Sequence, residues 1–279
     1  MKVGISITTQ LSNILKSLRK NPDKLGEIYL TSITNTLTFI DKYNLNYLEL
    51  ISVPPFDSEL LTKIERKLAK LIEDKDTIFH LPSWEVDISA MNKGMREAAV
   101  NELKKQIDII SNVGVGKFAI HPGSFGSLDY LYKALEEHSR KIILESILQL
   151  RDYCKKCASQ LFVENLPYHT PLFTRPEEFD KFVEYDVPLV LDTSHAVTAG
   201  QNPVDFLKRF KEAVVEIHLV DGFLDKPDKH YALGDGDVNL DEIVKTIKKL
   251  RLDPILMLEV VTPQDIEKSM KKLKEYKVV

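Results

Sequence analysis

Short apolar segments alternate with longer amphipathic segments along the chain. Eight segments of four to six residues are rich in Val, Ile, Leu and Phe, and we expect each to be a strand: 3–7, 46–51, 77–80, 117–121, 161–164, 188–192, 214–219 and 255–260. Between them apolar residues recur every three to four positions, as in Leu30, Ile33, Leu37 and Ile40, which is the spacing of a helix buried along one face. We therefore expect helices over 11–20, 30–43, 58–73, 100–110, 128–158, 176–183, 203–211, 240–250 and 266–273.

This order of elements predicts the fold class. Strands that are apolar on both faces, each followed by a helix, indicate a parallel sheet covered by helices, and eight such units indicate a closed α/β barrel, the (β/α)8 or TIM barrel. We expect one domain over residues 1–279, because barrels of about this length are single domains. A doubly wound open sheet is the alternative, but no glycine-rich GxGxxG sequence follows the first strand.

Composition and charge narrow the class of protein. The chain is 43% hydrophobic and 29% charged, as in ordinary globular proteins, and its formal charge of −4 gives no basic surface for non-specific binding of nucleic acids. No apolar run approaches the ~20 residues that span a bilayer, and MKVGISITTQ lacks the features of a signal peptide. We therefore expect a cytoplasmic protein with no membrane association.

The two cysteines, Cys154 and Cys157, form a CxxC pair. A redox or metal-binding pair is one interpretation, and two thiols one turn apart on a helix is the other. We favour the second, because no strand and turn precede the pair and no other CxxC completes a zinc site.

Acidic and imidazole side chains stand where the predicted strands end. These residues are Glu49, His80, His121, Glu164, Asp192, His218 and Glu259, and His195, Asp221, Asp228 and His230 follow in the loops. The carboxyl ends of barrel strands meet at one mouth, so we expect these side chains to converge there. A single histidine at a strand end is usually an ordinary hydrogen-bonding residue, but so many such groups at one mouth indicate bound cations.

The nitrogen and oxygen ligands, without thiolate, suit Zn²⁺ or Mn²⁺ better than Mg²⁺. One ion needs about four to six ligands, so nine candidates predict two or three ions. They are His80, His121, Glu164, Asp192, His195, His218, Asp228, His230 and Glu259. Glu49 is a substrate contact or a residue that orients a ligand, and Asp221 contacts substrate or orients a ligand rather than binding metal.

The motifs around these residues resemble a known superfamily from about Asn46 onward. They are, in order, FHLP, AIHPGS, VENLP, LDTSHA, IHLVDG, DKHYALGDGD and MLEV. They resemble the xylose isomerase-like TIM barrels (AP endonuclease family 2), which include endonuclease IV and many sugar-phosphate isomerases and epimerases. The resemblance to endonuclease IV implies three zinc ions, held by His80, His121 and Glu164, by Glu164, Asp192, His218 and Glu259, and by His195, Asp228 and His230.

In the isomerase branch the resemblance implies one ion on Glu164, Asp192, His218 and Glu259, and proton transfer by the two glutamates. The chain departs from endonuclease IV in VGISITTQ, which has no histidine, in ISVPP, in IHLVDG and at Ser83, where a tyrosine is usual. These departures count against DNA recognition and leave the metal ligands in place.

We therefore predict a metal-dependent isomerase or epimerase acting on a sugar or sugar phosphate. Glu164 and Glu259 would transfer the proton, and Trp84 and His169 would close the pocket. The alternative is an endonuclease IV-like zinc phosphodiesterase that cleaves DNA at abasic sites. A third possibility is an inactive, metal-stabilised binding protein, which the presence of both catalytic carboxylates disfavours.

Overall fold

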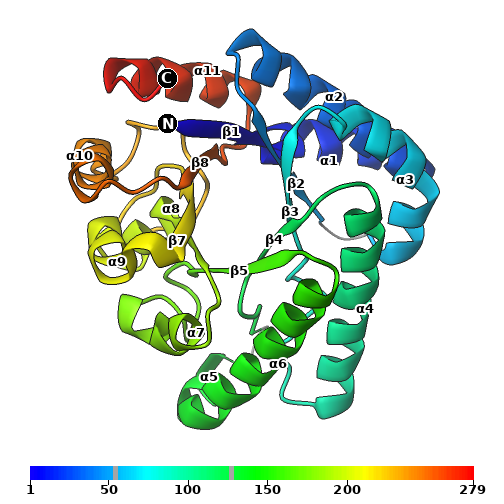
Figure 1. The fold of residues 1–279 in the computed structure, drawn as a ribbon, viewed down its shortest axis with the longest axis vertical. Coiled ribbons are helices and arrows are strands. Elements are labelled where there is room, and N and C mark those ends of the chain that lie inside the picture. Colours follow the sequence, from blue (N-terminus) through cyan, green and yellow to red (C-terminus); the bar gives the residue numbers. More distant parts are fainter. Residues whose placement is uncertain (53–55, 126–128) are drawn as a thin grey trace.

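Eight parallel strands close into a barrel in the order β1 to β8, which confirms the predicted fold class (Figure 1). The computed structural model describes residues 1–52, 56–125 and 129–279. The strands are β1 (Lys2–Ser6), β2 (Tyr47–Ile51), β3 (Asp76–His80), β4 (Lys117–Ile120), β5 (Gln160–Glu164), β6 (Leu189–Asp192), β7 (Val214–Leu219) and β8 (Ile255–Leu258). Pairing of β8 with β1 closes the barrel, and both ends of the chain lie beside that seam (Figure 1).

Helices surround the barrel on its outer side (Figure 1). They are α1 (Leu11–Lys20), α2 (Leu25–Lys42), α3 (Ser58–Ile72), α4 (Lys93–Asn112), α5 (Asp129–Ala134), α6 (Glu136–Lys156), α7 (Asp180–Glu184), α8 (Thr193–Thr198), α9 (Pro203–Phe210), α10 (Leu240–Leu250) and α11 (Pro263–Glu275). Short 3₁₀ turns are η1 (Ile7–Gln10), η2 (Pro22–Lys24), η3 (Pro176–Phe179) and η4 (Lys211–Ala213). The apolar faces of the helices pack on the strands and form the main core.

The interior of the barrel has an apolar layer below a polar one. Ile78, Phe162, Val190 and Met257 pack together inside the barrel and are almost fully buried. Each lies two residues before a strand-end candidate, so both point to the same face of their strand. The apolar layer thus forms a floor under the side chains at the carboxyl ends.

The close approach of β1 and β2 depends on Gly4. A Cβ atom at this position would lie 2.5 Å from the Cβ atom of Tyr47 and 2.7 Å from its carbonyl oxygen. A side chain at position 4 would therefore push the two strands apart.

Several predicted boundaries were wrong. The helix expected over 128–158 is two helices, because Leu135 leaves helical geometry at φ −112° and ψ 36°; Leu128 lies outside the described residues, as do 53–55 of ISVPP. The last strand ends at Leu258, where its pairing with β7 ends, and not at residue 260. Helix α2 begins five residues earlier than expected, and the short helix α8 was not expected.

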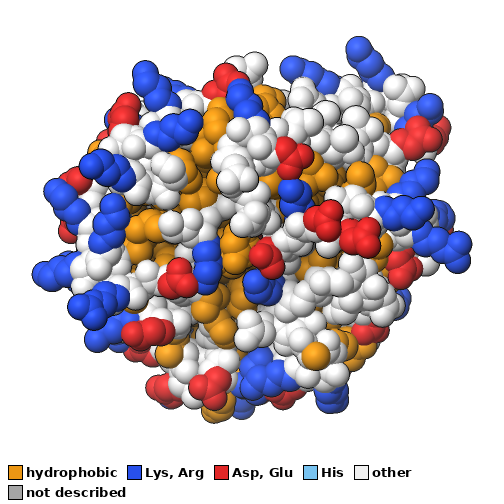
Figure 2. Space-filling model, turned by 45° about the horizontal axis from the view of Figure 1, so that its top comes forward, with side chains coloured by type: hydrophobic (Ala, Val, Ile, Leu, Met, Phe, Trp, Pro, Cys, Tyr) orange, Lys and Arg blue, Asp and Glu red, His pale blue; other side chains and the backbone are white. Residues whose placement is uncertain are grey.

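The cysteines lie at the end of a helix, and the surface carries both charges. Cys154 and Cys157 are free thiols at the end of α6, and burial raises the pKa of Cys154 to about 12. On the face shown in Figure 2, basic and acidic side chains are interspersed around patches of apolar surface. Within the described residues, every helix is too short or too polar to cross a membrane.

Candidate metal centre

The nine predicted ligands form one continuous cluster at the carboxyl ends of the strands. Each has a nitrogen or oxygen atom within 4.0 Å of another member. Glu164 at the end of β5 is the hub, because it lies within 3.4 Å of His80, His121, His195 and His218. The fold thus brings together residues that are up to 179 positions apart, from His80 to Glu259.

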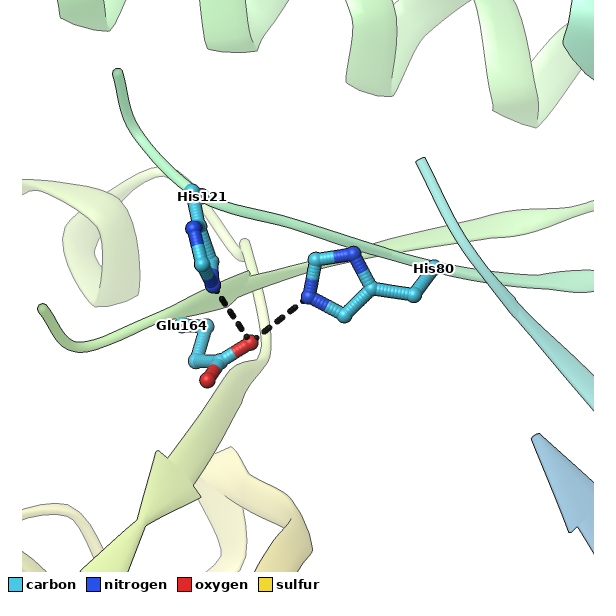
Figure 3. A group of neighbouring side chains, drawn as sticks. All are labelled: His80, His121 and Glu164. Atoms are coloured by element: carbon cyan, nitrogen blue, oxygen red, sulfur yellow. Dashed lines mark hydrogen bonds and ion pairs between the residues drawn. The ribbon is translucent and has the colours of Figure 1, made fainter. Parts of the chain in front are cut away.

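One group consists of His80, His121 and Glu164 (Figure 3). The Nε2 atoms of His80 and His121 lie 2.8 and 3.2 Å from the Oε2 atom of Glu164. The Nδ1 atom of His80 donates to the carbonyl oxygen of Leu81 at 2.9 Å, and the Nδ1 atom of His121 lies 3.3 Å from the hydroxyl of Ser83. Both rings therefore turn their Nε2 atoms towards the same carboxylate oxygen.

A second group consists of Glu164, Asp192, His218 and Glu259, and all four are buried. The Nδ1 atom of His218 lies 2.9 Å from Glu259, 3.4 Å from Glu164 and 3.8 Å from Asp192. Asn165 joins the ends of β5 and β6, because it donates to the carbonyl oxygen of Asp192 and accepts from its N–H group. Three carboxylates from different strands thus surround one imidazole nitrogen.

A third group lies towards the loop after β7. Asp192, His195 and His230 have ligand atoms within 4.8 Å of one another, and Asp228 lies 3.3 Å from His195 and 2.7 Å from His230. The Nδ1 atoms of His195 and His230 donate to the carbonyl oxygens of Asn165 and Glu259 at 2.8 Å each. His230 has a φ of +51°, an uncommon backbone conformation that is associated with functional sites.

Opposite charges dominate the electrostatics of the centre. Burial lowers the pKa of His80, but its hydrogen bond to Glu164 and the negative charges of Glu164, Glu49 and Glu259 together outweigh burial and raise that pKa to about 9. In the same way Asp228 and Glu259 raise the pKa of His230 to about 10 against burial. Burial would raise the pKa of Glu259, but His218 and His230 lower it to about 2. The centre therefore holds carboxylates beside imidazoles that readily take up protons, with the exception of His121, whose pKa is lowered by burial.

The donor set fits divalent cations. Glu164 Oε1, Asp192 Oδ2 and His218 Nδ1 are buried, form no hydrogen bond and point into the second group. Buried polar atoms without a partner are costly, and a cation would satisfy all three. Imidazole nitrogen with carboxylate oxygen is a ligand combination that suits zinc and manganese.

A cavity of about 390 Å³ opens above the centre. Of the nine ligands, its lining includes His80, His121, Glu164, His195, Asp228, His230 and Glu259. The predicted pocket residues Trp84 and His169 also line it, and Trp84 is 64% exposed. This volume is within the range of small-molecule sites.

The other two predicted substrate contacts are not on the cavity wall. Asp221 is fully buried, and its carboxylate accepts from the N–H groups of Gly222, Gly234 and Val238 at 2.8–3.0 Å. It thereby clamps the loop between β7 and α10, which carries Asp228 and His230.

Glu49, the second of these residues, lies beneath the centre. It forms a buried group with His218 and Glu216, and the Nε2 atom of His218 is 3.2 Å from Glu49 and 3.9 Å from Glu216. Sequence reasoning missed Glu216. A signal was present, because a charged residue two positions before His218 in an apolar strand points to the same face.

Comparison with known proteins gives one family and several similar folds. The family described as xylose isomerase-like TIM barrel matches residues 37–276. The uncharacterized protein MJ1311 of Methanocaldococcus jannaschii is 22% identical over 260 residues, which cover 88% of this chain and 85% of that protein.

Two solved structures share the whole fold. The structure of a D-tagatose 3-epimerase-like protein has a TM-score of 0.79 and 20% identity, and the match covers 99% of this chain and 97% of the other. D-allulose 3-epimerase from Methylomonas sp., solved in complex with D-allulose, has a TM-score of 0.70 and 15% identity, with 99% and 96% coverage. At such identities the similarity establishes the fold.

Proposed function

Because the chain belongs to the xylose isomerase-like TIM barrel family, we propose that it is a divalent-metal-dependent epimerase or isomerase of sugars. One observation carries the proposal: Glu164 and Glu259 both line the cavity and both face the Nδ1 atom of His218. They come from β5 and from the residue after β8, so they reach the centre from different sides of the barrel.

The second group is the place for the catalytic ion. Glu164, Asp192, His218 and Glu259 would hold it through three carboxylates and one imidazole nitrogen. When bound, such an ion supplies positive charge that binds substrate oxygens and makes the C–H bond beside a carbonyl more acidic.

The two glutamates would move the proton. One takes the proton from the carbon next to the carbonyl, and the electron pair of the broken C–H bond passes into the carbonyl to give an enediolate. The other returns a proton to the opposite face of that carbon, which inverts its configuration. Neighbouring histidines lower the pKa of both glutamates against burial, so either can start as the base.

The cavity suits a small sugar. Its volume of about 390 Å³ accommodates a hexose, and D-allulose is bound by one of the similar structures. Lys229 is the one lysine or arginine among the described residues that line the cavity. Trp84 and His169 at the rim can pack against the ring of a sugar.

Exchange of the substrate proton tests this proposal. The metal-loaded protein is incubated with free ketohexoses and with ketose phosphates in D₂O, and NMR follows deuterium at the carbon beside the carbonyl together with the new epimer. We expect both signals for at least one sugar, and their loss in Glu164→Gln and Glu259→Gln. Absence of exchange with every ketohexose and ketose phosphate in wild type refutes the proposal.

A second function is supported by the third group of ligands. An isomerase needs only the second group, whereas His195, Asp228 and His230 also converge here. This favours a zinc phosphodiesterase acting on abasic DNA as the second candidate. Three zinc ions per chain, with nicking of an abasic-site duplex that Glu164→Gln abolishes, would establish it in place of the epimerase.

A further inference from the structure

We propose that Glu49 is a positioning residue that makes His218 a stronger ligand than the other four histidines of the centre. The inference rests on the proposed function in one respect: His218 must bind the catalytic ion. The evidence is a comparison of the five histidines by the partner of the ring nitrogen that faces away from the centre.

The four other histidines share one arrangement. His80, His195 and His230 present Nε2 to the centre and donate Nδ1–H to backbone carbonyl oxygens at 2.8–2.9 Å. His121 also presents Nε2, and its Nδ1 atom lies by the Ser83 hydroxyl. The nearest partner of each of these Nδ1 atoms is therefore neutral, although the Nδ1 atom of His195 also lies 3.2 Å from the carboxylate of Glu164.

His218 is reversed. Its Nδ1 atom faces Glu164 and Glu259, and its Nε2 atom faces the carboxylate of Glu49 at 3.2 Å. When Nδ1 binds an ion, the ring proton must be on Nε2, where Glu49 is the nearest acceptor. A carboxylate that accepts a hydrogen bond from this N–H group increases the negative charge on the ring and so strengthens the bond to the metal.

Glu49 has no other partner among the described residues. It is fully buried, and neither carboxylate oxygen forms a hydrogen bond. Its neighbours across the strands are Ser6 and Ile78, and Ile78 belongs to the apolar floor of the barrel. A carboxylate in such a place needs a positive or donating group, and the Nε2 atom of His218, which is also without a hydrogen bond in this structure, lies 3.2 Å away.

Glu216 provides a matched comparison. It is equally buried and lies on the same strand as His218, but its nearest oxygen is 3.9 Å from Nε2, which is beyond hydrogen-bond range. An ion between Glu49, Glu216 and His218 is the competing explanation. It would require His218 to give up both ring protons, because the Nδ1 atom already faces the second group of ligands.

Metal affinity measured without any sugar tests the proposal. Zinc and cobalt dissociation constants are determined by competition with a chromogenic chelator for wild type, Glu49→Gln, Glu49→Leu and Glu216→Gln. We expect the constant of the tightest site to rise about 10- to 100-fold in Glu49→Gln, further in Glu49→Leu and little in Glu216→Gln. The visible bands of bound Co²⁺ should shift in the Glu49 variants at unchanged thermal stability.

Three results overturn this proposal alone. The first is a Glu49→Gln protein that binds zinc as tightly as wild type, and the second is an equal loss of affinity in Glu216→Gln. The third is an extra metal equivalent in wild type that both glutamine variants lose, because this result places an ion between Glu49, Glu216 and His218. A wild-type chain that binds neither metal overturns this inference together with the proposed function, whereas tight binding without epimerase activity refutes only the latter.

A measurement on wild type covers the case in which the variants fail to fold. NMR of the zinc-loaded protein should show one histidine with its proton on Nε2 and a strongly downfield ring N–H signal. Four histidines of the centre should carry the proton on Nδ1. Five rings of the same tautomer contradict the proposal.

Discussion

The Nε2 atom of His80 lies 2.8 Å from the Oε2 atom of Glu164, which is a hydrogen-bond distance. The pKa of His80 is raised to about 9 and that of His230 to about 10, chiefly because the carboxylates around them outweigh burial. At pH 7 both rings are therefore protonated. A metal ion must displace these protons before it can bind.

We predict that metal affinity rises with pH. Neutral imidazole is the ligand, so zinc affinity should increase from pH 6.5 to 9, and binding at pH 7 should release protons. Isothermal titration calorimetry in two buffers of different ionisation enthalpy measures the number of protons released. Affinity that stays constant between pH 7 and 9 contradicts the prediction.

The same ion pairs predict how the metal-free fold responds to pH. The folded-state pKa values of His80 and His230 are raised above the value of about 6.5 in the unfolded chain. Their contribution to stability is therefore complete below about pH 6.5 and is lost as the pH rises through 9 to 10. Urea titrations of the metal-free protein across this range should show a falling midpoint, and zinc should remove the effect.

Replacement of either glutamate at the cavity should greatly lower the rate of turnover. Glutamine keeps the shape of Glu164 or Glu259 but cannot accept the substrate proton, so we expect kcat to fall about 10²- to 10⁴-fold. Glu145→Gln on the exposed face of α6 is the matched control and should retain wild-type activity. Metal content must be measured in each variant, because both glutamates are also candidate ligands. Normal activity in either variant excludes that residue as the base.

Loss of the clamp at Asp221 should destabilise the loop after β7. In Asp221→Asn the amide nitrogen faces a backbone N–H group, and charged hydrogen bonds to three backbone groups are weakened. We expect a loss of about 3 kcal/mol in the free energy of unfolding. The exposed Asp225→Asn in the same loop should change it little, since asparagine also tolerates the positive φ there. Equal stability of the two variants contradicts the clamp.

Removal of the Trp84 side chain should weaken substrate binding without affecting the fold. The side chain is 64% exposed at the rim of the cavity, so its deletion leaves no buried hole. We expect Trp84→Ala to raise KM about 2- to 10-fold at unchanged thermal stability, the value of one aromatic contact. Tyr185→Ala, at another exposed aromatic, is the control. An unchanged KM for Trp84→Ala argues that the indole does not cover the sugar.

Much of the fold and the metal centre was predictable, because both depend on features that recur along the chain. Each strand is a short apolar run, and each ligand stands where a run ends, so the barrel geometry brings them together. The break at Leu135 was not predictable, because the apolar spacing continues through it. The role of Asp221 was not predictable either, because it depends on backbone groups up to 17 residues away.

The role of Glu216 was not predictable from the sequence for a different reason. One charged residue inside an apolar strand is visible in the sequence, but the distances that separate its role from that of Glu49 are not. The distance of 3.2 Å joins residues of β2 and β7, two strands that do not pair with each other, whereas the distance of 3.9 Å joins two residues of β7. Only the packed structure gives the first distance.

The clamp at Asp221 has a consequence for engineering. Its three bonds and the pairing of Asp221 with Tyr231 fix the path of the loop through backbone groups, independently of the side chains at 228 and 230. Libraries confined to residues 223–230 would therefore leave the anchor intact. Substitutions at 228 and 230 would then change the number of ions that the centre binds without changing the path of the loop.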